Sequence, residues 1–256
     1  MTVTRVLLVR HGQASAGASD YDELSPLGRT QSQKLGQWLA ERGKAPTHIL
    51  VGPRKRHRDT FDEIATAYHQ TLGLVLDGQL VEDRSSAVPR RLPVPTMLED
   101  LDEHHGIQLL VLLAPTLTQR EDAIGRAAKR AFGGGGKRAF IELILHVMPA
   151  WARGELHHPE VEPWPDFVAR ARSLPTRLSK LGDTANVWAI TSGGLISTVV
   201  GDALGCSLER TFELMFATRN TAMSELSVRR DGADPGLSLF SFNTLPHLDE
   251  DHVTFV

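Results

Sequence analysis

The fold is decided by one stretch near the start of the chain, Arg5-Val6-Leu7-Leu8-Val9-Arg10-His11-Gly12-Gln13-Ala14-Ser15. Residues 6–9 of this stretch are wholly aliphatic, a pattern typical of a strand buried on both faces of a sheet. Arg10, His11 and Gly12 follow where that strand should end. Ligands bind at the carboxyl ends of the strands in open α/β sheets. The sequence therefore predicts a ligand site at this turn.

The residue types at the turn suit phosphate chemistry. The Arg10 guanidinium can hold an anion through paired N–H donors. A neutral nitrogen of His11 can attack phosphorus. Gly12 lets the backbone turn tightly and approach a ligand. Gln13 and Ser15 follow closely enough to contact the substrate, so we expect Gly12, Gln13 and Ser15 to bind it.

Composition indicates a soluble globular protein. The chain has 256 residues, of which 41% are hydrophobic and 23% charged. Its net charge of -3 argues against a general nucleic-acid binder. A single cysteine, Cys206, excludes an internal disulfide and a cysteine zinc site. Because no apolar run approaches a membrane span or a signal peptide, we expect a cytoplasmic protein with no membrane partner.

Beyond the first strand, helix signals alternate with short apolar runs. Ser25 before Pro26 is a typical helix N-cap, and Gly43 is a typical helix end. The predicted helices cover residues 26–43, 56–72, 164–181, 193–204 and 208–216. The further predicted strands cover residues 47–51, 187–191, 222–229 and 237–242. This order predicts an α/β fold, a three-layer sandwich with a mostly parallel central sheet flanked by helices.

The middle of the chain differs in character. Residues 77–100 contain prolines and scattered charges, typical of a loop. Residues 105–160 have a helical pattern interrupted by four consecutive glycines at 133–136. We therefore expect a helical cap insertion over residues 77–160, added to an α/β core made of residues 1–76 and 161–256 within a single domain.

The motifs of the whole chain resemble those of the histidine phosphatase superfamily, the group that includes cofactor-dependent phosphoglycerate mutases. They appear in that family's order and span residues 5 to about 230. The matching motifs are Arg10-His11-Gly12, Leu24-Ser25-Pro26-Leu27-Gly28 with Gln31, Pro53-Arg54-Lys55-Arg56 with Thr60, Leu101-Asp102-Glu103 with Gly106, and Ser192-Gly193-Gly194.

The resemblance implies roles for three of these residues. His11 is the nucleophile that becomes phosphohistidine, and Arg10 and Arg56 hold the phosphoryl oxygens, where cations stabilise the charge of an in-line transfer. Because Arg56 opens a helix, the N-terminus of that helix should also face the anion. We expect Arg54 and Arg58 to be surface charges.

The resemblance also implies a general acid near residue 103. A leucine two residues before and a glycine soon after favour Glu103, which would protonate the leaving group and then activate water. Such an acid should have a raised pKa. Glu99 is the second choice, and Asp100 and Asp102 compete for the same role.

One position departs from the family pattern. The turn at Ser192 usually reads His-Gly, and that histidine donates a hydrogen bond to the phosphate. A serine hydroxyl also donates but brings no charge, which costs about 2.7 to 4 kcal/mol of transition-state stabilisation. Ser192 should cap the next helix, and the N–H groups of Gly193 and Gly194 should face the anion. Three histidines that also fit ordinary loop positions are candidates to replace the imidazole: His57, His104 and His105.

Together these features predict a phosphomonoesterase for a small phosphorylated substrate, requiring no cofactor and no metal. An inactive or weak phosphate-binding or partner-binding protein is the alternative that Ser192 sustains. A phosphoglycerate-mutase-type phosphotransferase is less favoured, because Gln13 stands where those enzymes carry Glu. The strands at 222–242 could pair two copies into a homodimer, and Asn220 with Thr221 could close the pocket from the far side.

Overall fold

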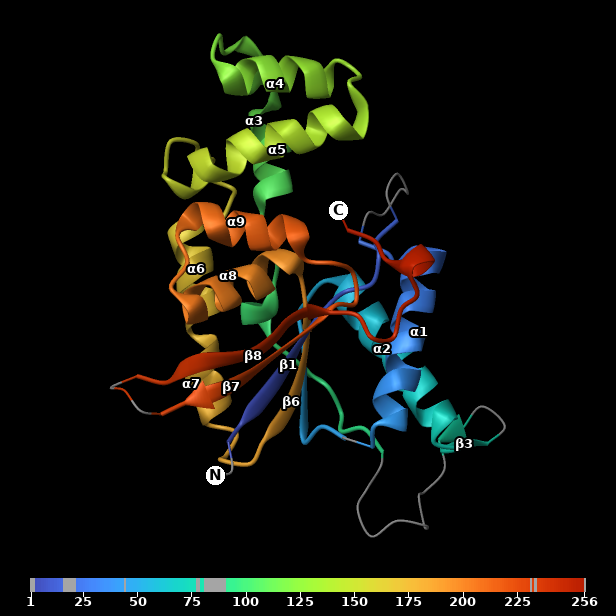
Figure 1. The fold of residues 1–256 in the computed structure, drawn as a ribbon. Coiled ribbons are helices and arrows are strands. Elements are labelled where there is room, and N and C mark those ends of the chain that lie inside the picture. Colours follow the sequence, from blue (N-terminus) through green and yellow to red (C-terminus); the bar gives the residue numbers. More distant parts are fainter. Residues whose placement is uncertain are drawn as a thin grey trace. The chain divides into compact units, whose positions relative to one another are not determined.

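The computed structural model describes residues 3–15, 22–43, 45–76, 79–80, 91–230, 232 and 234–255. The chain divides into two compact units, one made of residues 1–103 with 171–256 and the other of residues 104–170. Figure 1 labels the helices and strands of both units.

The first unit contains a six-stranded mixed sheet in the order β5-β2-β6-β1-β7-β8. Its strands are β1 (Arg5–Arg10), β2 (His48–Val51), β5 (Thr96–Met97), β6 (Asn186–Thr191), β7 (Met223–Arg229) and β8 (Gly236–Thr244). The pairs β1–β6, β6–β2 and β2–β5 are parallel, whereas β7 is antiparallel to both β1 and β8. The prediction of a mostly parallel central sheet is confirmed.

Both faces of this sheet are covered by helices. Successive side chains of a strand point to opposite faces, so a strand that is apolar throughout must be buried on both. Val9, Ile49 and Ile190 pack in one buried cluster with side chains of α1 (Pro26–Glu41) and α2 (Lys55–Thr71). The opposite face is covered by α7 (Leu174–Ser179) and α8 (Gly193–Leu204), and α9 (Leu208–Ala217) packs on α8; all three lie across the sheet from α1 and α2 in Figure 1. The three-layer prediction is thus confirmed.

Local sequence signals explain most element ends. The Ser25 hydroxyl accepts a hydrogen bond from the Gly28 N–H at 3.0 Å, which caps α1. Gly43 follows α1 with φ +65°, a conformation that glycine adopts without strain. The helix predicted over residues 164–181 is instead two helices, α6 (Trp164–Arg172) and α7. Pro175 explains the break, because proline lacks an N–H and its ring clashes with the preceding turn.

The second unit is helical. It contains α3 (Gly106–Gln119), α4 (Ala123–Phe132), α5 (Gly136–Ala152) and most of α6. Gly134 has φ +92° between α4 and α5, so the glycine run ends a helix as predicted. Trp151, Trp164 and Phe167 surround the His104 ring at centroid distances of 5.9, 6.1 and 5.6 Å.

This unit begins later in the chain than the predicted insertion. Strand β5 pairs with β2 through Leu50 and Thr96, and the short helix η1 (Glu99–Leu101) follows it, so residues 96–103 belong to the first unit. A two-stranded sheet of β3 (Val75–Leu76) and β4 (Gln79–Leu80) precedes them. Residues 77–78 and 81–90 of the predicted loop lie outside the described residues.

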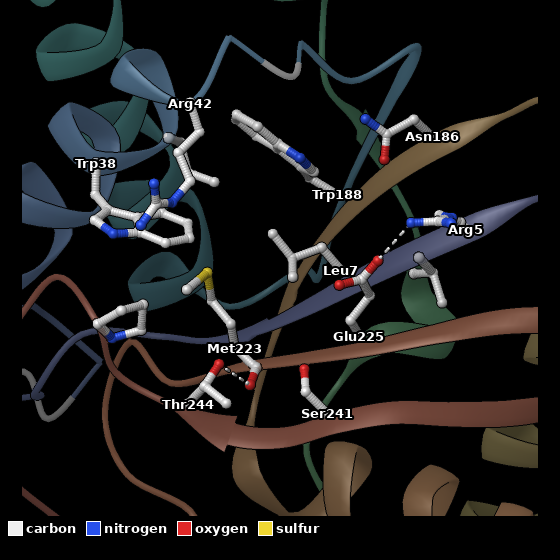
Figure 2. A pocket seen from close by; sticks show the side chains of 13 residues that line it. Arg5, Leu7, Trp38, Arg42, Asn186, Trp188, Met223, Glu225, Ser241 and Thr244 are labelled. Atoms are coloured by element: carbon white, nitrogen blue, oxygen red, sulfur yellow. Dashed lines mark hydrogen bonds and ion pairs between the residues drawn. The ribbon is translucent and has the colours of Figure 1, made fainter.

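A cavity of about 170 Å³ lies in the first unit beside the amino end of β1, as Figure 2 shows. The Arg42 guanidinium lies 4.1 Å from the centre of the Trp38 ring, and Arg5 pairs with Glu225 at 3.2 Å. Because Arg5 and His11 lie at opposite ends of β1, this cavity is separate from the turn that carries His11. Among the described helices, none is long and apolar enough to cross a membrane.

Candidate active site

His11 follows the last residue of β1 and is oriented by its own backbone. Its Nδ1 lies 2.7 Å from the Gly12 carbonyl oxygen. A carbonyl only accepts, so Nδ1 carries the hydrogen and Nε2 keeps a lone pair. Burial, followed by the charges of Arg56 and Arg10, holds the pKa of His11 well below 6.5. The imidazole is therefore neutral near pH 7, as a nucleophile must be.

The backbone of His11 is held from both sides. Its N–H donates to the Thr191 carbonyl at 2.9 Å, and its carbonyl accepts from Asn220 Nδ2 at 3.1 Å. The Thr221 N–H donates to the Arg10 carbonyl at 3.1 Å, with Thr221 itself at φ 55°. A positive φ in a β-branched residue is strained, so the hydrogen bonds at this turn fix an unfavourable conformation. In this structure Asn220 and Thr221 hold the backbone of His11 and Arg10.

The glycine at position 12 is explained by packing. A Cβ there would lie 2.5 Å from the Gly28 carbonyl oxygen, and one at Gly28 would lie 2.1 Å from the Gln13 oxygen. Glycine at both positions lets the start of α1 approach the turn closely. The Gly12 N–H also donates to Thr60 Oγ1 of α2 at 3.0 Å. The turn is thereby joined to both helices that cover this face.

Gln13 and Ser15 contact protein groups in the structure. The Gln13 Oε1 accepts from the Ser25 hydroxyl at 2.8 Å, and the Gln13 N–H donates to Gln31 Oε1 at 3.0 Å. The Ser15 N–H donates to the Glu23 carbonyl at 2.8 Å. Gln13 thus supports the cap of α1, and its predicted contact with substrate stays a prediction, as does that of Ser15.

Two buried arginines lie near His11. Arg10 and Arg56 are each 6% exposed. An Arg10 terminal nitrogen donates to the Thr218 carbonyl, and its guanidinium lies against Gly193, where a Cβ would be 3.3 Å from Nε. After burial, the charges of Arg56 and Arg10 contribute most to lowering the pKa of His11, so both guanidinium groups lie close enough to act on the imidazole.

A carboxylate that sequence reasoning missed lies at the start of α2. Asp22 accepts from Arg56 NH1 at 2.8 Å and from the Lys55 N–H at 2.7 Å. The sequence predicted that the N-terminus of α2 faces the substrate anion. In this structure the Asp22 carboxylate binds there instead. Nothing in the sequence marks Asp22, since it lies in a polar loop with no motif of its own.

The four competing acids have different surroundings. Asp102 is bound by Arg54 Nε at 2.5 Å and accepts from the Glu103 N–H at 2.7 Å. Asp100 pairs with Arg177 and with the Ser173 hydroxyl, and Glu99 is exposed. Arg54, predicted to be a surface charge, is instead part-buried because it pairs with Asp102.

The Glu103 carboxylate reaches the turn after β6. Its Oε2 accepts from the Gly194 N–H at 3.2 Å, in the first turn of α8. The parallel register of β1 and β6 pairs Arg10 with Thr191, so this turn lies beside His11. The geometry therefore favours Glu103 over the three other acids.

Ser192 does not cap α8 as predicted. It occupies the N-cap position, but its hydroxyl makes no capping hydrogen bond. The Oγ lies 2.6 Å from His57 Nε2 instead, and the His57 ring is centred 5.7 Å from that of His11. His104 lies in the aromatic cluster of the second unit, and His105 lies 3.8 Å from Glu162. Of the three candidate histidines, His57 is the one that contacts Ser192.

A family model of the histidine phosphatase superfamily (branch 1) matches residues 6–84 and 138–237, more than half of the chain. The chain belongs to the histidine phosphatase superfamily. This confirms the predicted family and, at that level, the predicted enzyme class. No curated protein matches the sequence significantly.

Solved histidine phosphatases share the fold. A mycobacterial glucosyl-3-phosphoglycerate phosphatase in complex with VO3 is 21% identical, with a TM-score of 0.57, covering 94% of this chain and 99% of the other. An α-ribazole phosphatase from Shigella flexneri is 17% identical, with a TM-score of 0.55, covering 94% and 96%. At these identities the similarity concerns the fold.

No cluster of three or more His, Cys, Asp or Glu side chains with the geometry of a metal site occurs within the described residues. The groups assembled at the ends of β1 and β6 are a neutral imidazole, two guanidinium groups, a carboxylate and a serine–histidine pair. In a histidine phosphatase fold, this set has the chemistry required to bind and transfer a phosphoryl group.

Proposed function

We propose that this chain is a phosphomonoesterase that hydrolyses a small phosphorylated substrate through a phosphohistidine on His11. The observation that carries the proposal is the hydrogen bond from His11 Nδ1 to the Gly12 carbonyl, which leaves the Nε2 lone pair for attack. Low pKa, burial and two adjacent guanidinium groups support it. The family membership supports the same class of reaction.

The reaction divides into two transfers. Arg10 and Arg56 bind the phosphoryl oxygens while His11 Nε2 attacks phosphorus, and the bond to the leaving oxygen breaks as Glu103 gives that oxygen a proton. The resulting Glu103 carboxylate then takes a proton from water, whose oxygen attacks the phosphohistidine. Inorganic phosphate leaves, and neutral His11 with protonated Glu103 is restored.

The names of the two solved phosphatases support the proposed substrate class. Both are named as phosphatases, of glucosyl-3-phosphoglycerate and of α-ribazole phosphate respectively, which supports a phosphate monoester. We place the reaction in the cytoplasm, with no metal and no nucleic-acid or membrane partner. A homodimer through β7 and β8 remains a prediction from the sequence.

A second candidate function rests on Asp22. Its carboxylate is bound to Arg56 and to the start of α2, where a phosphoryl group would also bind. If substrate did not displace it, the protein would bind phosphate weakly without turnover. An Asp22→Asn variant should therefore bind inorganic phosphate more tightly than the wild type, while leaving His11 in place.

The test is hydrolysis of p-nitrophenyl phosphate without added metal, across about pH 4 to 9, by the wild type and by His11→Ala. We expect activity that disappears in the variant, together with an acid-labile, alkali-stable phosphoenzyme in the wild type only. His69→Gln is the matched control, because His69 is also buried on α2 but bonds to the Leu92 N–H. Activity that survives in His11→Ala would overturn the mechanism.

A further inference from the structure

Ser192 occupies a helix N-cap without acting as one. Its backbone is extended, at φ -113° and ψ 164°, and the residue is fully buried. A serine that caps a helix accepts a hydrogen bond from a backbone N–H of the first turn. Here the hydroxyl is 2.6 Å from His57 Nε2, a short contact for a hydrogen bond between oxygen and nitrogen. The structure thus favours the serine–histidine contact over the cap.

Three segments of the chain surround the His57 side chain. The residue lies in the first turn of α2 next to Arg56, and it is 0% exposed. A Cβ on Gly52, which follows β2, would lie 2.3 Å from His57 Nδ1, so a glycine is required there for the ring to fit. Nδ1 is buried against that backbone and meets the geometry of a hydrogen bond with none of the described residues, although the nearby Gly52 backbone acts to raise the pKa of the ring. Strand β2, α2 and the start of α8 therefore all contact this one imidazole.

The surroundings of His57 are strongly cationic. Burial and then the charges of Arg56, Arg54 and Arg58 hold its pKa well below 6.5. From β1 it faces His11, which is neutral as well. A phosphoryl group bound at Arg10 and Arg56 would offset these cations. Its negative charge would also favour a hydrogen on Nε2, because that hydrogen points toward Ser192 and the anion.

We propose that His57 and Ser192 act together as a hydrogen-bond donor pair for the phosphoryl group, in which an imidazole from α2 replaces the missing one at the turn after β6. His57 Nε2–H donates to Ser192 Oγ, and the Ser192 hydroxyl hydrogen is thereby directed to a phosphoryl oxygen. No bond of the substrate is made or broken by the pair. His57 is a positioning residue that acts through Ser192, and the proposal rests on the proposed phosphatase function.

A donor pair differs from a merely structural contact in its energetic coupling. If His57 acts only by orienting Ser192, then removing either residue removes the same donor, and the double variant loses no more than a single one. The loss should appear in kcat more than in KM, because charge on the phosphoryl oxygens is greatest in the transition state. A structural contact would instead lower stability without this pattern.

The first experiment measures kcat and KM for Ser192→Ala, His57→Leu and the double variant with p-nitrophenyl phosphate. We expect each to lower kcat on the order of 10² to 10³-fold, without additivity. His57→Gln keeps an N–H donor of similar reach and should recover most of the loss, whereas His69→Gln should match the wild type. If His57→Leu does not fold, His57→Asn, whose donor is too short to reach Ser192, replaces it. Additive losses, or a Gln variant no better than Leu, would overturn the pair.

The second experiment does not need turnover. Calorimetric titration with sulfate, which does not titrate near neutral pH, measures anion binding by the same variants. We expect weaker binding by Ser192→Ala and His57→Leu than by the wild type, and near wild-type binding by His57→Gln. A wild type that binds sulfate in this pattern but hydrolyses nothing would refute the phosphatase function alone. Active enzyme with equal sulfate affinity and equal kcat in all variants would refute the pair alone.

Discussion

The turns after β1 and after β6 lie side by side, with Arg10 opposite Thr191, and they supply their imidazoles in different ways. The first turn carries its own histidine, aligned by a hydrogen bond to the next carbonyl. The second turn carries Ser192, whose hydroxyl contacts a histidine from α2. A functional group can therefore be kept in place while the residue that provides it moves to another element.

The difference has a structural basis. The His11 N–H donates to the Thr191 carbonyl, its carbonyl accepts from the Asn220 side-chain amide, and its ring Nδ1 donates to the Gly12 carbonyl. His57 is held by a helix start and by the space that Gly52 leaves beside its Nδ1. In the proposed mechanism, the first arrangement fixes a nucleophile that must attack along one line, and the second fixes a donor that only has to reach an oxygen. We therefore expect the first turn to be far less tolerant of substitution.

The largest expected effect compares the two turns directly. His11→Ala should lower kcat/KM for p-nitrophenyl phosphate by about 10⁴-fold or more, because the covalent route is lost. Ser192→Ala should lose on the order of 10² to 10³-fold, because only one donor is removed. Steady-state kinetics on folded variants give the ratio. Equal losses in the two variants would remove the distinction between nucleophile and donor.

The next prediction tests whether Glu103 or Asp102 is the general acid that protonates the leaving group. Glu103→Gln should lower kcat for an alkyl phosphate such as glycerol phosphate by about 10² to 10⁴-fold, because an alkoxide needs a proton to leave. With p-nitrophenyl phosphate the first transfer should remain fast, and rapid mixing should show a burst of p-nitrophenolate before slow hydrolysis. Asp102→Asn, which loses the pair with Arg54, should affect both substrates alike. A leaving-group dependence in the Asp102 variant instead would transfer the acid role to it.

The sequence predicted the sheet, the Ser25 cap and the position of His11 at the end of a strand because each depends on local chemistry. An aliphatic run, a Ser-Pro pair and an Arg-His-Gly turn are recognisable from neighbouring residues alone. Asp22, Arg54 and the capping behaviour of Ser192 were missed or misjudged because their partners are distant in sequence. Asp22 meets Arg56 across 34 positions that include α1 and β2, and Ser192 meets His57 across 135 positions. His57 was named only as one of three candidates, since nothing local distinguishes it from His104.

A substitution toward the family pattern tests how far the second turn has adapted to serine. Ser192→His would place an imidazole ring, much larger than the serine side chain, in a fully buried site that His57 already fills. Overpacking of this kind typically costs about 1 to 3 kcal/mol, so we expect the single variant to be less stable and no more active. Adding His57→Ala makes room and should recover stability and part of the activity. Denaturant unfolding with matched kinetics shows this, and a single variant as stable as the wild type would contradict it.

The smallest effect is a pH dependence of stability that both turns share. Burial and nearby arginines lower the pKa of His11 and of His57 below 6.5 in the folded protein. Below about pH 6.5 the unfolded chain therefore binds more protons at these two histidines than the folded chain does. Stability contributed by keeping them neutral is complete above pH 6.5 and is lost as pH falls toward their folded pKa values, by about 1.4 kcal/mol per pH unit for each.

The variant His57→Gln removes one of these two contributions and keeps the other. Its free energy of unfolding should fall less steeply than that of the wild type between about pH 6.5 and 5, whereas Ser192→Ala, which keeps His57 buried, should follow the wild-type slope. Urea unfolding at several pH values measures all three. Parallel curves for the Gln variant and the wild type would mean that folding does not lower the pKa of His57. The imidazole of the second turn would then gain a positive charge as pH falls below about 6.5, as an ordinary histidine does.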